Sequence, residues 1–216
     1  MIIAETFLWL HLPKTGGTSM NRLFRSLALP AVEIDADADR AKHDSVTLRE
    51  SRGSWRAGVR RRFISSRRLS SWLLSDWRHK RRHMGLPDLP LEPVRSGLFY
   101  SLRLGGVWVA ADWWLRYFEL GESVTALRLE HLAEDLNRHL LPLLPAATAP
   151  LLQDALPREN ARPLPSTSDG DPAESVLFSA EDLARQRCAN PLWAAWEQRV
   201  YGGRQRSATP LRHPGP

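Results

Sequence analysis

The sequence predicts a three-layer α/β domain in which a central parallel sheet of four or five strands is flanked by helices. Short apolar runs alternate with segments whose apolar residues recur at helical spacing. The chain has 216 residues, a length typical of one domain. Its 43% hydrophobic and 25% charged residues are ordinary for a globular protein. We expect one domain over residues 1–202 and a disordered basic tail over residues 203–216.

The first strand is expected over residues 7–12, because this apolar run ends at Pro13 and at Gly16-Gly17. A helix should follow from Thr18, since apolar residues then recur at helical spacing up to Pro30. The next elements are a short strand over residues 42–48, a strand over residues 59–66, and a helix from Leu69 through Trp77 into the basic cluster Arg78–Arg82.

The second half begins with a loop marked by three prolines, Pro87, Pro90 and Pro93. Residues 106–120 are apolar on nearly every face, which predicts a buried helix with its tryptophans in the core. Ser179 and Asp182 resemble a capping box at the start of a helix. The other elements are a strand over residues 124–130, a helix over residues 132–141, an irregular connection over residues 142–172, and a last helix after Asn190-Pro191.

Composition excludes several classes of protein. The single cysteine, Cys188, excludes a disulfide framework and multi-cysteine metal sites, and we expect it to be an inert packing residue. No apolar stretch approaches the roughly 18 residues that cross a bilayer. Glu5 stands where a signal peptide would carry positive charge. We therefore expect a cytoplasmic protein with no transmembrane segment.

The positive charge is concentrated in one segment. The net charge is +6, and 27 of the 30 basic residues are arginine. Between Arg49 and His83, twelve Lys and Arg residues face only two acidic ones. Such a block attracts anions such as nucleic acid, phosphate or sulfate. A solvated helix face is the simpler alternative.

The sharpest feature is the segment His11–Ser19, which reads HLPKTGGTS between the first strand and the first helix. A turn at this place points backbone N–H groups and the positive end of the helix dipole toward one spot. Glycines allow close approach of anionic oxygens, and Lys14 adds a mobile cation. A plain Gly-Gly turn is the simpler alternative. The ATPase and GTPase pattern G-x-x-x-x-G-K-[ST] does not occur in this chain.

This segment resembles the 5′-phosphosulfate loop of sulfotransferases that use 3′-phosphoadenosine 5′-phosphosulfate (PAPS). It is most similar to the carbohydrate-sulfotransferase branch, which tends to read H-[IL]-P-K-[TC]-G-[GS]-[TS]-[ST]. The resemblance implies a P-loop-like fold over residues 1–202 and sulfuryl transfer to a hydroxyl. It implies that Lys14 holds the phosphosulfate and the leaving oxygen. The phosphate would be cradled by Thr15, Gly16, Gly17, Thr18 and Ser19.

The family's 3′-phosphate element resembles R-[DN]-P-x-x-R-x-x-S between a strand and a helix. Two registers fit this chain. Arg67 with Ser75 preserves the strand and the helix, and we prefer it for that reason. The other register uses Arg62, Arg67 and Ser70. Neither register has the proline. Weaker similarities to the family occur at Leu127–Leu132, Arg158–Ala161, Phe178–Leu183 and Val200–Gly202.

Sulfuryl transfer needs a general base near the acceptor hydroxyl. By the resemblance we assign this role to His43, with Glu130 as the alternative, although a structural anchor is the simpler role for Glu130. His11 is expected to brace the loop. His79 and His83 lie four residues apart, and we read them as a solvated basic face rather than a metal site. The mechanism needs no metal.

The acceptor is expected to bear a hydroxyl, and the arginines of the cluster Arg78–Arg82 would suit an acidic glycan. Nucleic acid is not expected as a partner. Trp72 and Trp77 should pack beneath their helix rather than stack on a ligand. Two alternative functions remain open. One is a kinase-like P-loop enzyme that uses ATP, and the other is a sulfotransferase-like protein that binds a polyanion or nucleotide without catalysis.

Overall fold

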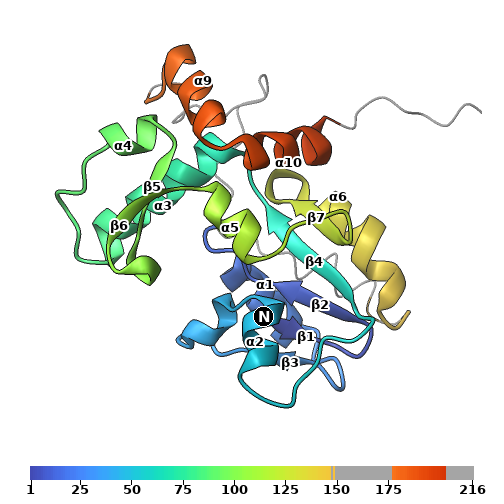
Figure 1. Ribbon diagram of the computed structural model, residues 1–216. Helices are drawn as coiled ribbons and strands as arrows, with labels where there is room; N and C mark the ends of the chain where they lie inside the picture. Colours follow the sequence, from blue (N-terminus) through green and yellow to red (C-terminus); the bar gives the residue numbers. More distant parts are fainter. Residues whose placement is uncertain (147, 149–176, 203–216) are drawn as a thin grey trace, which may run out of the picture.

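The computed structural model describes residues 1–146, 148 and 177–202, so the expected tail over residues 203–216 lies outside the described residues. It shows an α/β fold in which helices flank a mixed five-stranded sheet (Figure 1). The strand order is β3-β1-β2-β4-β7. The strands are β1 (Ile2–Ile3), β2 (Phe7–Leu10), β3 (Glu33–Ile34), β4 (Arg61–Ser66) and β7 (Val124–Arg128).

The sheet is only partly parallel, whereas the sequence predicted a wholly parallel one. β2, β4 and β7 run parallel, with Leu10 opposite Ile64 and Ser66 opposite Arg128. The two-residue strand β1 pairs antiparallel with both β2 and β3. β1 was not predicted, because the N-terminal residues are mostly apolar and the short turn between β1 and β2 leaves no clear pattern that separates the two strands. The carboxyl ends of β2 and β4 therefore lie side by side.

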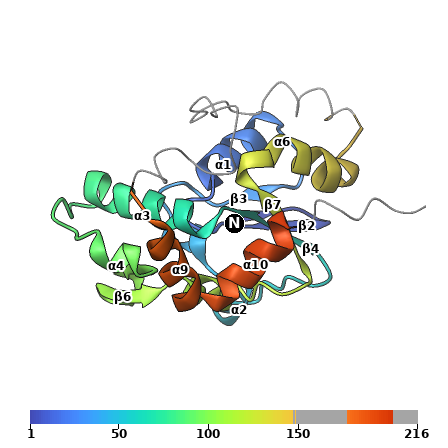
Figure 2. The ribbon, with the colours of Figure 1, turned by 90° about the horizontal axis from the view of Figure 1, so that it is seen from above.

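The two faces of the sheet carry separate cores, because side chains alternate along a strand. Phe7 and Trp9 face one core, and Leu8 and Leu10 face the other. Figure 2 shows α1 and α6 on one side of the sheet and α2 and α10 on the other. The helices that cover these faces are α1 (Gly17–Ser26), α2 (Val46–Ser51), α3 (Leu69–His83), α5 (Asp112–Tyr117), α6 (Leu132–Asp135) and α10 (Pro191–Tyr201).

Shorter elements complete the fold. A hairpin of β5 (Leu98–Ser101) and β6 (Val107–Ala110) packs beside α3, α4 (Glu92–Arg95) and α9 (Ala180–Ala189). The remaining turns are η1 (Arg40–His43), η2 (Leu102–Leu104), η3 (Leu129–His131), the π-helical η4 (Leu136–Leu140) and η5 (Leu141–Leu143). No helix of the described residues combines the length and apolarity that crossing a membrane requires.

The predicted helix over residues 106–120 is wrong in its first half. Residues 107–110 form β6, which pairs with β5 and places Trp108 opposite Tyr100. Gly105 and Gly106 have φ values of 83° and 81°. This conformation, which favours glycine, ends η2 and turns the chain back into β6 of the hairpin. The helix begins only at Asp112. Of the three tryptophans here, Trp114 is buried, whereas Trp108 and Trp113 are half-buried at the edge of the core.

The predicted strand over residues 42–48 is also wrong. The segment forms η1 and then α2, and the side chain of Ser45 caps α2 by accepting a hydrogen bond from the backbone N–H of Leu48 at 3.2 Å. Cys188 is exposed and therefore is not the packing residue that was predicted. The strands predicted over residues 7–12, 59–66 and 124–130 and the helices predicted from Thr18, Leu69, Ser179 and Pro191 are confirmed with small shifts of their bounds, as is the capping box between Ser179 and Asp182. The helix predicted over residues 132–141 is α6 followed by the π-helical η4. Most of the connection predicted over residues 142–172 lies outside the described residues.

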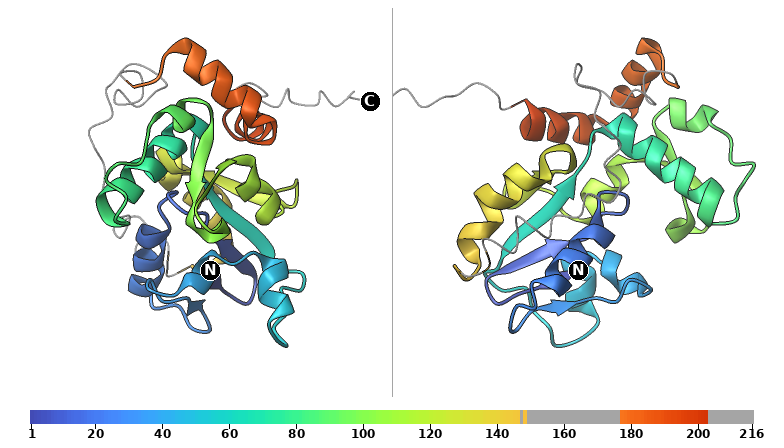
Figure 3. Two further views of the ribbon diagram at one scale, coloured as in Figure 1. Left: turned by 60° about the vertical axis from the view of Figure 1, so that its left-hand side comes forward. Right: turned by 180° about the vertical axis from the view of Figure 1, so that it is seen from behind.

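Two buried polar residues join α5 to α10. Asp112 accepts hydrogen bonds from the backbone N–H groups of Leu192 (2.9 Å) and Trp193 (2.7 Å). The side chain of Asn190 accepts one from the backbone N–H of Asp112 at 3.0 Å. Asp112 thus caps α10. Figure 3 shows that α10 lies across the end of β4.

The Asp112→Ala substitution should lower the free energy of unfolding by about 2–3 kcal/mol, because it leaves the buried N–H of Trp193 and the partly buried N–H of Leu192 without an acceptor. Urea denaturation of the whole chain measures this loss. Asp88→Ala is the matched control, because Asp88 is exposed. Equal stabilities of the two variants would contradict the capping role.

Candidate functional site

Two strand-to-helix junctions meet at the carboxyl edge of the sheet. One joins β2 to α1 through residues 11–16, and the other joins β4 to α3 through residues 67–68. The indole N–H of Trp72, on α3, donates a hydrogen bond to the carbonyl of Pro13 at 2.7 Å. Trp72 is fully buried, so it ties the junctions together and is unavailable to stack on a ligand. The structure therefore brings the two motifs predicted from the sequence to one place.

The first junction is tightly packed around its glycines. Gly16 precedes α1 with a φ of 82°, which favours glycine. A Cβ on Gly17 would lie 1.6 Å from Nε2 of His11, so the imidazole occupies the space that a side chain would need. Thr15 is buried, and its hydroxyl donates to the carbonyl of Leu12 at 2.8 Å. His11 thus braces the loop, as the sequence predicted.

The start of α1 is an electropositive end. The first backbone N–H groups of a helix have no acceptor within the helix, and the helix dipole places about half a positive charge there. No acidic residue lies in the first turn of α1, and no side chain caps it. This turn contains Gly17, exposed Thr18 and half-buried Ser19. The arrangement is suited to an anion.

Lys14 has a φ of 65°, a region that residues with a Cβ rarely adopt. Such strain persists where the surrounding structure holds it, often at functional sites. Burial lowers the pKa of the Lys14 ammonium, the nearby carboxylate of Asp76 raises it, and Arg67 and Lys80 lower it. Lys14 therefore lies among charged residues of the second junction and α3.

Asp76 and Lys80 form an ion pair on α3 beside Lys14. Asp76 is 7% exposed, and burial raises the pKa of its carboxyl against the opposing effects of Lys80 and Lys14. Lys80 also lies 5.0 Å from the ring centre of Phe99. Sequence reasoning missed both residues. The sequence pattern that could have indicated this ion pair is a single acidic residue in a basic helix, followed four positions later by a lysine.

The second junction presents Arg67. Its Nε donates to the hydroxyl of Ser71 at 2.8 Å, and half-buried Ser75 lies one turn further along α3. Arg62 lies near the opposite end of β4, with its guanidinium 4.0 Å from Glu119. The structure therefore brings Arg67, and not Arg62, toward Lys14. Ser71 was missed by sequence reasoning, although its spacing from Arg67 is helical.

Helix α10 fixes the end of β4. The indole N–H of Trp196 donates to the hydroxyl of Ser66 at 2.9 Å. The backbone N–H of Leu69 donates to Glu197 at 3.0 Å, so Glu197 caps α3 from another helix. The hydroxyl of Tyr201 donates to Glu130 at 2.6 Å. This contact gives Glu130 a structural anchor at the sheet edge.

His43 packs against His11, with ring centres 4.6 Å apart. It lies on η1 rather than on the predicted strand. Its Nδ1 is 2.8 Å from the carbonyl of His11, so Nδ1 carries the proton and Nε2 holds a lone pair. Burial lowers the pKa of His43 to about 4 and that of His11 to about 2. Both rings are therefore neutral at pH 7.

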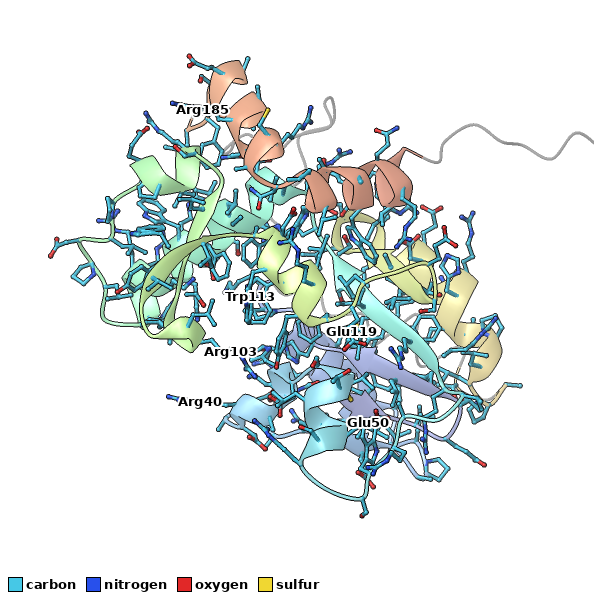
Figure 4. All side chains as sticks on the ribbon, viewed as in Figure 1. Arg40, Glu50, Arg103, Trp113, Glu119 and Arg185 are labelled. Atoms are coloured by element: carbon cyan, nitrogen blue, oxygen red, sulfur yellow. The ribbon has the colours of Figure 1, made fainter. Side chains whose placement is uncertain are left out.

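Arg103 comes from the β5–β6 hairpin and approaches His43. It pairs with Asp44 at 3.0 Å, and its positive charge contributes to the low pKa of His43. In Figure 4, Arg103 extends from the hairpin toward the turn that carries Arg40. The hairpin and η1 thus meet beside the first junction.

Most of the basic block is engaged with the chain itself. Arg49 pairs with Asp35 at 2.7 Å, and Arg68 lies 3.5 Å from Glu197. Arg52 pairs with Asp44, and the side chain of Arg60 donates to backbone carbonyls. Much of the positive charge that the composition places in this block is therefore engaged with carboxylates and carbonyls of the chain itself.

No family model, no curated protein and no solved structure matches this chain. Arg158–Ala161, which resemble part of the sulfotransferase family, lie outside the described residues. Within the described residues, no three His, Cys, Asp or Glu side chains are grouped as metal ligands. The ring centres of His79 and His83 are 5.2 Å apart, and His79 is half-buried rather than fully solvated.

Gly17→Ala should lower the free energy of unfolding by about 1–3 kcal/mol, because its Cβ overlaps the His11 ring. Much of that loss should disappear when the same change is made in a His11→Ala background. Thermal and urea unfolding of the four variants of this cycle give the coupling. Gly53→Ala is the control, since nothing lies within 4 Å of its added Cβ. Additive losses would show that the two residues do not pack together.

Stability should fall as the pH drops from about 6.5 to about 4. An unfolded His43 takes up a proton near pH 6.5, whereas the folded residue does so only near pH 4. The folded state therefore loses up to about 1.4 kcal/mol per pH unit from this one group. Urea unfolding at pH 7, 6 and 5 should show a shallower decline for His43→Gln than for the natural chain. His83→Gln, at an exposed position, should keep the natural decline. Equal slopes for all three proteins would refute this assignment.

Proposed function

We propose that this protein is a PAPS-dependent sulfotransferase with a P-loop-like donor site, which moves a sulfuryl group to an acceptor hydroxyl. One observation carries the proposal. Lys14, at the electropositive start of α1, and Arg67, at the end of the neighbouring strand, lie at one sheet edge and interact electrostatically. Open α/β sheets bind nucleotides at the carboxyl ends of their strands.

The donor has anionic groups at both ends of its nucleoside, and the two junctions offer two cationic places. We assign the 5′-phosphosulfate to the start of α1 and the 3′-phosphate to Arg67 and Ser75. Arg67 is already oriented by Ser71, so its remaining N–H groups are held in a fixed direction. The 5′ end would contact Lys14, Thr15, Gly16, Gly17, Thr18 and Ser19.

In the proposed reaction the acceptor oxygen attacks sulfur in line with the departing phosphate oxygen. A new S–O bond forms to the acceptor, the S–O bond to the 5′-phosphate breaks, and 3′-phosphoadenosine 5′-phosphate leaves. Lys14 stabilises the negative charge that develops on the leaving oxygen. Nε2 of His43 takes the acceptor proton, since its lone pair is fixed by the Nδ1 contact. The scheme requires no metal ion.

The two alternative functions have less support. A kinase-like enzyme needs a carboxylate that holds a metal, and the buried acid beside Lys14 is Asp76, whose charge is paired with Lys80. A protein that binds nucleotide without catalysis would not need the neutral His43 beside the loop. The sulfotransferase therefore explains more of the observed arrangement than either alternative.

Calorimetric titration with 3′-phosphoadenosine 5′-phosphate tests the donor site. We expect binding by the natural chain and an affinity at least about tenfold lower for Lys14→Ala, which removes one charge-assisted contact. ATP and ADP, which lack the 3′-phosphate, should bind more weakly. Arg116→Ala is the charge-matched control, because Arg116 is exposed on α5.

Lys14→Gly separates folding from binding. It should preserve or raise stability, since glycine adopts the positive φ without strain, and it should still lose affinity. If only ATP bound, the kinase-like alternative would replace the proposal. If neither nucleotide bound, the loop would not be a donor site.

A further inference from the structure

The β5–β6 hairpin ends in an exposed apolar segment. Residues 102–108 read LRLGGVW, so apolar side chains flank a glycine turn, where polar residues are usual. Leu102, Leu104 and Val107 are 44%, 40% and 45% exposed, and we call these three residues the apolar tip. In the part of the chain that the structure describes, they are half of the large apolar side chains that are exposed. Such a concentration is typical of a binding surface.

The charged residue of this segment, Arg103, is directed back toward the protein. Its guanidinium pairs with Asp44 at 3.0 Å and lies 4.7 Å from the ring centre of Tyr117. Figure 4 shows Arg103 extending from the hairpin toward the turn that carries Arg40. The hairpin therefore keeps its charge on the protein side, whereas the side chains of the apolar tip remain exposed to solvent.

Two aromatic rings lie directly behind the apolar tip. Tyr100 on β5 and Trp108 on β6 are cross-strand partners, and their ring centres are 5.4 Å apart. Both side chains are half-buried. Tyrosine and tryptophan combine an apolar ring with a polar O–H or N–H group, and both are enriched at the boundary between the headgroups and the acyl chains of a bilayer. The order of groups along the hairpin is therefore that of a membrane-interface element.

The C-terminal end of α3 lies beside the hairpin. β5 packs against α3, and Nζ of Lys80 is 5.0 Å from the ring centre of Phe99. From that contact, Leu102 is about 10 Å further along the hairpin, and Met84 is about 6 Å further along α3. Met84 is itself 48% exposed. Figures 1 and 3 show the end of α3 and the end of the hairpin on the same side of the molecule, away from the five-stranded sheet.

Positive charge accompanies the apolar side chains at this end of the molecule. Arg81 and Arg82 are exposed in the last turn of α3. Neither forms an ion pair with a carboxylate of residues 1–146, 148 or 177–202. Asp88 is the only acidic residue among residues 77–91. Exposed cations beside exposed apolar groups are complementary to a surface that carries anionic phosphates over an apolar layer.

We propose that this end of the protein binds the surface of a lipid bilayer that contains anionic phospholipids. The apolar tip inserts between the headgroups, and Arg81 and Arg82 contact lipid phosphates, which guanidinium groups bind well. A protein partner fits less well, because a stable interface buries about 800 Å² on each side, far more than these few side chains offer. The proposal does not depend on the proposed function, since it uses none of the donor-site residues.

Co-sedimentation of the full chain with phosphatidylcholine vesicles tests the proposal. Vesicles that also contain phosphatidylglycerol should be bound at least about tenfold more tightly than vesicles of phosphatidylcholine alone, because each arginine near an anionic surface adds attraction. Added salt should weaken this binding. Failure of the natural chain to bind the phosphatidylglycerol vesicles would refute the proposal.

Substitutions in the apolar tip separate insertion from charge attraction. Leu102→Ser/Leu104→Ser keeps the net charge and should bind the phosphatidylglycerol vesicles at least about tenfold more weakly, because serine gains little on entering an apolar layer. Val59→Ser is the control, since Val59 is fully exposed in the loop before β4, and it should bind as the natural chain does. Thermal unfolding checks that both variants are folded. Equal binding by the two variants would show that the apolar tip does not insert.

Substitutions in α3 test the contribution of the arginines. Arg81→Gln/Arg82→Gln should also bind at least about tenfold more weakly, whereas Arg81→Lys/Arg82→Lys should retain most of the affinity. The control is Arg61→Gln/Arg138→Gln, which removes the same charge from exposed residues of β4 and η4. Equal losses in the two glutamine variants would indicate diffuse attraction by the net charge of +6 and would overturn the proposal.

A second copy of the chain is the competing occupant of the apolar tip. In the absence of vesicles, the natural chain and Leu102→Ser/Leu104→Ser should have the same sedimentation coefficient. An oligomer that the double variant abolishes would make the apolar tip an interface between copies instead. The nucleotide titration remains a separate test, because Leu102→Ser/Leu104→Ser should bind 3′-phosphoadenosine 5′-phosphate as the natural chain does. Vesicle binding without nucleotide binding would support this proposal while the proposed function failed.

Discussion

The parallel pairing of β2 with β4 is the constraint on which the candidate site depends. Because the two strands run in the same direction, each delivers its following loop to the same sheet edge, and the two helices start there together. An antiparallel pair would have placed Arg67 and Lys14 at opposite ends of the sheet. The hydrogen bond from Trp72 to Pro13 then sets the distance between α3 and the first loop. Helix α10 holds the second junction from outside through Trp196 and Glu197.

The basic residues near this edge of the sheet have two different roles. Most arginines of the basic block satisfy carboxylates or carbonyls, as Arg49 does with Asp35, and so stabilise local structure. Lys14 is held differently, in a strained backbone conformation and partly buried, where the charge of Asp76 opposes the effects of burial, Arg67 and Lys80. Backbone strain and the burial of a charge both cost free energy, and the net effect on Lys14 is a lowered pKa. A bound anion would offset the electrostatic cost, and this is the physical reason for placing a ligand there.

How much the sequence predicted depends on the range of the interactions involved. The loop at residues 11–19 and the capping box at Ser179 are local patterns, and both were found from spacing alone. Residues 106–120 misled the prediction, because uniform apolarity carries no period that separates a strand from a helix. The glycine pair Gly105-Gly106 was the better signal. The ion pair of Asp76 with Lys80 had a local signal in its spacing of four residues. Its approach to Lys14 could not be predicted, because that approach joins α3 to the first junction.

The low pKa of His43 has a consequence for the order of events at the proposed site. A histidine with a pKa near 4 is neutral but only weakly basic, so it would be a poor proton acceptor in the free protein. Its depression comes first from burial and then from nearby positive charges, Lys42 and Arg103 among them. A donor that carries several negative charges would counter those cations and raise the pKa of His43. The base would therefore gain strength when the donor is bound, so that proton removal from the acceptor depends on the presence of the group to be transferred.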